Sequence, residues 1–133
     1  MRFFIDTSAF YALIDADDRY HEEAKKEWIK MLNKLYELVC SNYVVLETFA
    51  LIQSRIGINA VRSFEEDILP VVKIEWVDAD VHHAGVSALL TASRRDLSLV
   101  DCVSFDLMRR HGLQHVFAFD EHFTEQGFQV SPK

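Results

Sequence analysis

Four acidic residues, far apart in the chain, each stand in an otherwise apolar segment. They are Asp6 after "RFFI", Glu47 within "NYVVLETFAL", Asp101 within "DLSLVDCVSFDLM" and Asp120 after "VFAF". Four carboxylates brought together would repel one another strongly unless cations lay between them. Carboxylate oxygens and waters are the ligands that Mg²⁺ and Mn²⁺ prefer. The pattern therefore predicts a divalent-cation site wherever the fold gathers these acids.

Each acid, taken alone, also has a structural explanation. Asp6 and Asp120 precede segments that favour helix, so either side chain is suited to cap a helix. Asp101 falls in a first helical turn, where acids are common because the helix N-terminus favours an anion. Glu47 either borders a pocket or is an exposed helical residue. Only the combination of the four favours a metal site.

Length and composition limit the classes of protein to consider. A chain of 133 residues predicts one domain, residues 1–133, with a single core. No segment approaches the roughly 20 apolar residues of a spanning helix and the start lacks a secretory signal, so we expect a cytoplasmic protein without a membrane partner. The net charge of −7 argues against general coating of nucleic acid. It does not exclude a nuclease whose acids lie around metal ions.

Hydrophobic patterning predicts alternating strands and helices. Strands are expected at residues 2–5, 39–41, 71–77, 116–119 and 128–130. Helices are expected at residues 9–16, 21–38, 44–56, 59–69, 79–93, 99–110 and 121–126, with Thr7 or Ser8 as the cap of the first helix. One face of the second helix is expected to consist of Ala24, Trp28, Met31, Leu32 and Leu35.

This alternation predicts an α/β fold with a central, mostly parallel sheet covered by helices on both faces. In such sheets ligands bind beyond the carboxyl ends of the strands. Asp6 and Asp120 each follow a strand, and they would meet if these two strands were neighbours. The fold prediction therefore supports the same site as the acids do.

Four segments carry a resemblance to a known family. "FIDTSAF", the isolated Glu47, "LSLVDCVSFDLM" and "FAFDEHFTEQGF" resemble the four acidic motifs of the PIN domain, in the same order and over nearly the whole chain. The length is similar to that of the VapC-type toxins within this family. The resemblance implies a three-layer α/β/α fold and four catalytic acids, Asp6, Glu47, Asp101 and Asp120, of which Asp6, Asp101 and Asp120 hold the metal.

The resemblance also implies supporting residues beside these acids. Thr7, Ser8 and Ser98 would act as hydroxyl helpers. Asp96 would be a fifth acid at the rim, although a helix cap or a surface position explains it equally well.

The activity that the resemblance implies is Mg²⁺- or Mn²⁺-dependent endoribonuclease cleavage of RNA. A metal-activated water would attack phosphorus in line and leave a 5′-phosphate and a 3′-hydroxyl. The expected partners are the RNA substrate, a cognate antitoxin and a second copy in a homodimer. The alternative is a PIN-like module that binds RNA or protein without cutting it, since a fold does not establish turnover.

Other side chains near the motifs favour simpler roles. Phe10, Tyr11 and Phe123 would be able to stack on bases, but their spacing favours core packing. Of the six histidines only His122 lies near one of the four acids, and a structural role or a place at the pocket rim is expected for it. A phosphatase of the haloacid dehalogenase type would need an aspartate at position 8, where this chain has Ser8. A receiver domain would need paired acids after its first strand, an aspartate in mid-chain and a late lysine, and the sequence does not contain this set.

Overall fold

A single parallel sheet organises the molecule, and the computed structural model describes all of residues 1–133. Its five strands lie in the order β3-β2-β1-β4-β5, and every neighbouring pair is parallel. The strands are β1 (Arg2–Ile5), β2 (Glu37–Ser41), β3 (Lys73–Glu75), β4 (His115–Phe117) and β5 (Gln129–Ser131). The mostly parallel sheet predicted from the sequence is confirmed.

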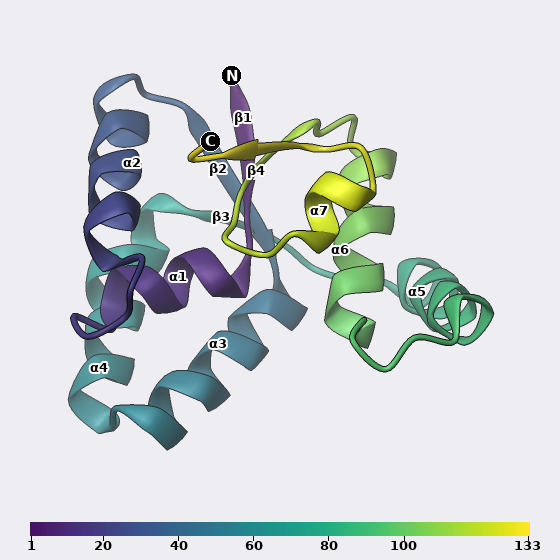
Figure 1. The fold of residues 1–133 in the computed structure, drawn as a ribbon, viewed down its shortest axis with the longest axis horizontal. Coiled ribbons are helices and arrows are strands. Elements are labelled where there is room, and N and C mark those ends of the chain that lie inside the picture. Colours follow the sequence, from purple (N-terminus) through teal and green to yellow (C-terminus); the bar gives the residue numbers. More distant parts are fainter.

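Helices cover both faces of this sheet. They are α1 (Thr7–Ile14), α2 (His21–Asn33), α3 (Asn42–Arg55), α4 (Ile58–Ser63), α5 (Ala79–Ala92), α6 (Leu99–Arg110) and α7 (His122–Glu125). Figure 1 shows α1, α2 and α4 on one side of the strands and α5 and α6 on the other, with α3 near the carboxyl ends of the central strands. The three-layer α/β/α prediction is thereby confirmed.

The central strands form the middle of the core. Phe4 and Ile5 of β1 and Val116 and Phe117 of β4 are fully buried, because helices cover both faces of these strands. β1 pairs with β4 so that Ile5 lies opposite Phe117. Asp6 follows β1, and Asp120 follows β4 after a short connection, so the strand order brings these two acids to the same edge of the sheet.

The first helix begins earlier than the sequence predicted. Asp6, and neither Thr7 nor Ser8, is the N-cap of α1, and its carboxylate accepts a hydrogen bond from the Ser8 amide. Thr7 and Ser8 already belong to the first helical turn. The correction has a physical basis, because the backbone leaves β1 in an extended conformation at Asp6 and turns helical only afterwards.

The second helix is shorter than predicted, and its end is a correction. α2 stops at Asn33 instead of continuing to residue 38, and Leu35 adopts a left-handed backbone conformation with its side chain exposed. Leu32 is also partly exposed, so these two leucines do not form the buried face. Residues from Glu37 onward pair with β1 and with β3, and these pairings override the local helical preference.

Smaller differences concern the ends of other elements. The strand predicted over residues 71–77 is limited to Lys73–Glu75, and the helix predicted to end before Pro70 passes at Phe64 into an irregular helical turn that includes Pro70. No helix is long and apolar enough to span a membrane.

Candidate active site

All four predicted acids line one cavity at the carboxyl edge of the sheet. It encloses about 320 Å³, and its lining consists of Asp6, Thr7, Ser8, Tyr11, Asp18, Tyr20, Glu47, Leu51, Arg55, Asp101, Phe119 and Asp120. The acids come from four separate segments, the end of β1, α3, α6 and the loop after β4. A larger hollow of about 570 Å³ between α5 and α6 contains none of these acids.

Asp6 is held in place by the residues that follow it. Its Oδ2 accepts hydrogen bonds from the Ser8 amide, at 3.1 Å, and from Ser8 Oγ, at 2.6 Å. The side chain is almost fully buried, and burial raises the pKa of Asp6 from 3.8 to about 7 against the opposing effect of the Ser8 hydrogen bonds. Asp101 and Asp120 raise it further through their negative charge. Asp6 is therefore a buried acid without a cationic partner.

Asp101 is positioned by a capping box at the start of α6. Ser98 Oγ accepts a hydrogen bond from the Asp101 amide at 3.0 Å, and Asp101 Oδ2 accepts one from the Ser98 amide at 3.1 Å. This reciprocal pair fixes the carboxylate against the helix start. Burial raises the pKa of Asp101 and outweighs the hydrogen bonds from Ser98. Asp101 therefore both caps α6 and lines the cavity, so the helix-cap and the site interpretation of this acid are compatible.

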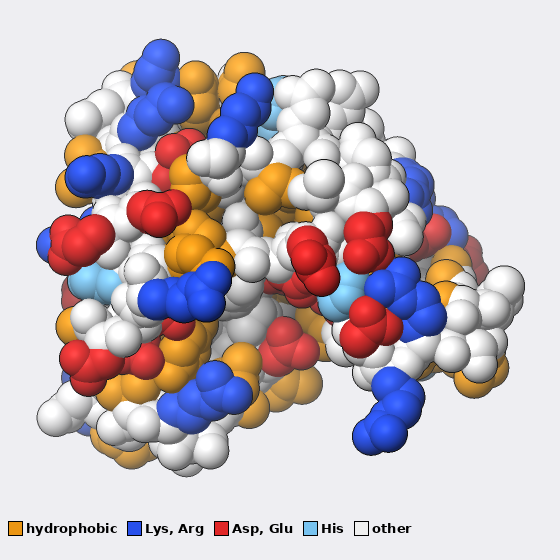
Figure 2. Space-filling model, in the orientation of Figure 1, with side chains coloured by type: hydrophobic (Ala, Val, Ile, Leu, Met, Phe, Trp, Pro, Cys, Tyr) orange, Lys and Arg blue, Asp and Glu red, His pale blue; other side chains and the backbone are white.

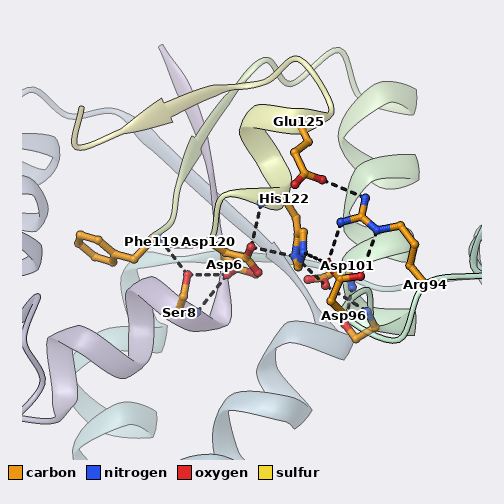
Figure 3. Close-up of polar contacts among 10 residues, drawn as sticks. Asp6, Ser8, Arg94, Asp96, Asp101, Phe119, Asp120, His122 and Glu125 are labelled. Atoms are coloured by element: carbon orange, nitrogen blue, oxygen red, sulfur yellow. Dashed lines mark hydrogen bonds and ion pairs between the residues drawn. The ribbon is translucent and has the colours of Figure 1, made fainter. Parts of the chain in front are cut away.

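Asp120 and His122 complete the cluster from the loop after β4. Asp120 Oδ1 accepts a hydrogen bond from the His122 amide at 2.9 Å, which turns the carboxylate toward Asp6 and Asp101 (Figure 3). His122 Nδ1 lies 2.9 Å from Asp120 Oδ1 and 3.7 Å from Asp101 Oδ2, yet it makes no hydrogen bond of normal geometry. Asp101, Asp120 and His122 each offer one ligand atom, and these atoms lie within 4.8 Å of one another.

Two opposing effects act on the His122 imidazole. Burial lowers its pKa, but the carboxylates of Asp96, Asp120 and Asp101 outweigh burial and raise it. The ring Nε2 lies 3.2 Å from Asp96 Oδ2. His122 therefore bridges the acids of the cavity and an acid on the surface.

Glu47 borders the cavity from α3. It is half-buried, and burial raises the pKa of Glu47, with Asp101 and Asp120 adding to the effect and Thr7 opposing it. Thr7 in turn connects α1 with α3, because Thr48 Oγ1 donates to Thr7 Oγ1 at 3.3 Å and to the Val44 carbonyl at 2.7 Å. The two helices thus hold Glu47 at a fixed distance from the other acids.

The donor set fits a hard divalent cation. None of the four acids forms an ion pair with a lysine or an arginine. Asp6 Oδ2, Asp101 Oδ2 and Asp120 Oδ1 are engaged by donors of the protein, while the other oxygen of each carboxylate accepts no hydrogen bond within the chain. Three carboxylates with one free oxygen each, in a cavity of about 320 Å³ that is large enough for water, match the ligands of Mg²⁺ or Mn²⁺.

Comparison with known proteins agrees with this geometry. Residues 3–129 match the PIN domain. The chain belongs to the PIN domain family.

One curated PIN-domain protein is similar to this chain in both sequence and structure. The 23S rRNA-specific endonuclease VapC20 of two Mycobacterium tuberculosis strains is 36% identical over 132 residues, which cover 98% of each chain. The crystal structure of VapC20, described as a sarcin-ricin loop cleaving toxin, has a TM-score of 0.84 over 95% of both chains. The predictions of a PIN-domain nuclease and of a VapC-type toxin are thereby confirmed.

Two more distant structures share the PIN fold. VapBC2 from Rickettsia felis, solved with a DNA fragment from its promoter, has a TM-score of 0.72 at 11% identity and covers 98% of both chains. FitAcB from Neisseria gonorrhoeae has a TM-score of 0.66 at 18% identity, over 98% of this chain and 96% of that chain.

Some predicted side chains lie outside the PIN cavity. Asp96 is exposed, does not line the cavity, and pairs with Arg94 at 2.7 Å. Phe10 and Phe123 are fully buried and pack in the core, whereas Tyr11 lines the cavity. Ser98 acts on the site through the capping box that holds Asp101.

Sequence reasoning missed five residues of the lining: Asp18, Tyr20, Leu51, Arg55 and Phe119. The segment "DADDRY" reads as an ordinary polar turn, and Arg55 stands at a helix end, where basic residues are common. Phe119 directly precedes Asp120, which was its only signal. These residues lie in one cavity only because the fold packs the turn before α2 against the loop after β4.

Proposed function

We propose that this protein is a Mg²⁺- or Mn²⁺-dependent endoribonuclease toxin whose substrate is the sarcin–ricin loop of 23S rRNA. The observation that carries the proposal is the convergence of Asp6, Glu47, Asp101 and Asp120 on one cavity in which none pairs with a lysine or an arginine. The choice of RNA rests on the 36% identity to VapC20 over nearly the whole chain. We also propose that residues 1–133 act as a single domain.

The side chains of the cavity would share the work as follows. Asp6, Asp101 and Asp120 hold the metal through the carboxylate oxygens that no protein donor engages, and Glu47 contacts it directly or through water. A divalent ion held by these carboxylates would supply a water of lowered pKa and stabilisation of charge on the leaving oxygen. Ser8 and Ser98 keep the carboxylates of Asp6 and Asp101 in position, so that little reorganisation accompanies metal binding.

Cleavage of a synthetic sarcin–ricin loop RNA by the purified protein tests this proposal. We expect cutting in Mg²⁺ or Mn²⁺ that leaves a 5′-phosphate and that stops in EDTA and in Asp101→Asn. Asp80→Asn is the matched control, because Asp80 also lies in a first helical turn but is exposed and outside the cavity.

Each other outcome contradicts part of the proposal. Equal cutting by wild type and Asp101→Asn would mean a contaminating nuclease, and no cutting by either would favour the alternative, a module that binds without cleaving. Cutting of an unrelated RNA pool with the sarcin–ricin loop left intact would refute the proposed target while keeping the ribonuclease.

The proposed partners follow from the toxin class. An antitoxin with a basic side chain would fit the acidic cavity. A structure of similar fold, VapBC2, supports such a partner, because its name is that of a toxin–antitoxin pair. We also propose a homodimer, which size-exclusion chromatography with light scattering would test on the purified protein. Because ribosomes are the proposed target, the cytoplasm is the proposed site of action.

A further inference from the structure

The wall of the cavity that faces the acids is aromatic and basic. Tyr11, Tyr20 and Phe119 line it, and Arg55 is the one lysine or arginine in the lining. Figure 2 shows acidic side chains to the right of a central hollow, and basic side chains among apolar and acidic ones to its left. The metal site uses only the acidic side, so the opposite wall requires its own explanation.

Tyr20 and Phe119 form a stacked pair in this wall. Their ring centroids are 4.6 Å apart and their planes differ by 11°. Both side chains are half-buried, so part of the pair faces the cavity. The Asp18 carboxylate accepts a hydrogen bond from the Tyr20 amide at 2.9 Å and thereby fixes the turn that carries Tyr20. The pair is a fixed, flat surface beside the reaction site.

Arginine side chains already lie on the aromatic rings of this wall. The Arg19 guanidinium lies 4.5 Å from the centroid of Tyr20, and the Arg55 guanidinium lies 5.4 Å from that of Tyr11. Both arginines are exposed. A planar guanidinium stacks on an aromatic ring much as a nucleobase does, so Arg19 marks a ring surface that accepts a flat group.

The aromatic wall is tied directly to the acidic one. The Phe119 amide donates a hydrogen bond to Ser8 Oγ at 2.9 Å, and Ser8 Oγ donates to Asp6 Oδ2 at 2.6 Å. Phe119 also directly precedes Asp120 in the chain. Figure 3 shows this chain of contacts from Phe119 through Ser8 to Asp6. A group stacked on the pair is therefore held at a set distance from the metal-binding carboxylates.

We propose that the Tyr20–Phe119 pair binds an unpaired base of the RNA next to the scissile phosphate, on the part of the pair that faces the cavity, while Arg55 contacts a neighbouring phosphate. The proposal rests on the proposed ribonuclease function and adds the recognition of one extruded nucleotide. Stacking of single-stranded bases on aromatic side chains needs no base-specific hydrogen bond. The wall thus selects an unstacked loop over a duplex, whose bases are not available for stacking.

Replacement of the rings tests the stacking. We expect Tyr20→Leu and Phe119→Leu to raise KM by about tenfold or more with little change in kcat, because a base–aromatic stack contributes this much to binding. Tyr20→Phe keeps the ring and should remain within about twofold of wild type. Tyr36→Leu is the matched control, since Tyr36 stacks on Phe3 outside the cavity. Arg55→Gln, with Arg62→Gln as its control, should weaken binding and lower its salt dependence.

A second measurement changes the RNA, so that the loss is first read on one and the same protein. RNAs with a single abasic site at each loop position near the cut are bound to Asp101→Asn, and affinity is followed by fluorescence anisotropy. At one position the abasic site should weaken binding to Asp101→Asn by about tenfold, and it should cost nothing further when Tyr20→Leu is added. Equal affinities for all abasic RNAs, or equal KM values for Tyr20→Leu and Tyr36→Leu, would overturn the proposal.

The outcome separates this inference from the proposed function. If wild type cuts RNA but Tyr20→Leu matches Tyr36→Leu, the stacking site is wrong and the ribonuclease stands. If wild type does not cut, the proposed function fails, and the anisotropy of the abasic series still decides whether the aromatic pair binds a base.

Discussion

Two acidic clusters lie near each other and differ in how their charge is balanced. On the surface, Asp96 and Glu125 both pair with Arg94, at 2.7 Å and 3.0 Å, and Arg94 holds the pKa of Asp96 well below its usual range. In the cavity, burial raises the pKa of Asp6 and Asp101, and no lysine or arginine pairs with them. The arginine of the chain neutralises the surface acids, whereas no lysine or arginine neutralises the cavity acids, which could hold a cation.

His122 lies between the two clusters. Its Nε2 contacts Asp96, and its Nδ1 approaches Asp120 and Asp101. The comparison teaches that the type of residue does not reveal its role. An aspartate serves the fold when a cation of the chain neutralises it, and it is available to a ligand when burial leaves it unpaired.

The largest expected effect comes from exchanging one acid in each cluster. Asp6→Asn should lower the cleavage rate by at least about 100-fold, because it removes a proposed metal ligand and not merely a supporting residue. Asp96→Asn should leave the rate within a few fold of wild type, as expected of an exposed ion pair. RNA cleavage under single-turnover conditions measures both, and a similar loss in the two variants would refute the distinction between the clusters.

The pH dependence of stability should reveal the unpaired charge. Asp6 has a pKa of about 7 when folded and an ordinary value near 3.8 when unfolded. Between these values the folded protein keeps a proton that the unfolded chain has released, so without metal the contribution of Asp6 to stability is greatest below about pH 4 and falls as pH rises toward 7. The loss from this group should be on the order of a few kcal/mol, measured by urea unfolding in EDTA.

Two controls sharpen this prediction. Asp6→Asn should remove much of the dependence, since its side chain has no proton to lose. Mg²⁺ or Mn²⁺ should raise the melting temperature of wild type more at pH 8 than at pH 6, because the metal competes with protons for the carboxylates. A wild-type stability that rises through this interval would contradict the unpaired state of the acid.

The smallest effect concerns the residue that positions Asp101. Ser98→Ala removes the hydroxyl of the capping box and should cost about 1 kcal/mol of stability. The Ser98 amide still holds the Asp101 carboxylate, so cleavage should fall by less than about tenfold. Ser54→Ala is the control, as Ser54 is an exposed helical serine without a side-chain hydrogen bond. Thermal unfolding and cleavage rates together test this role, and an unchanged stability would exclude it.

Much of the fold and of the candidate site was predictable because its signals are local. α6 was predicted with its observed bounds, since Ser98 and Asp101 form a capping box and Gly112 follows its end. α2 was predicted too long, because the sequence around Leu35 favours helix while pairing of β2 with β1 and β3 requires an extended chain from Glu37. A local pattern contains no information about that competition.

The sequence by itself determined which four acids are candidates for the site and where in their elements they stand. Apolar periodicity and caps depend on neighbours along the chain, so Asp6 after a strand and Asp101 in a first helical turn were visible without a structure. Only the tertiary structure decided that β1 and β4 are neighbours, that His122 bridges two acidic clusters, and that Tyr20 stacks on Phe119. The physical reason is that these contacts join distant segments, and their geometry follows from the packing of the whole chain.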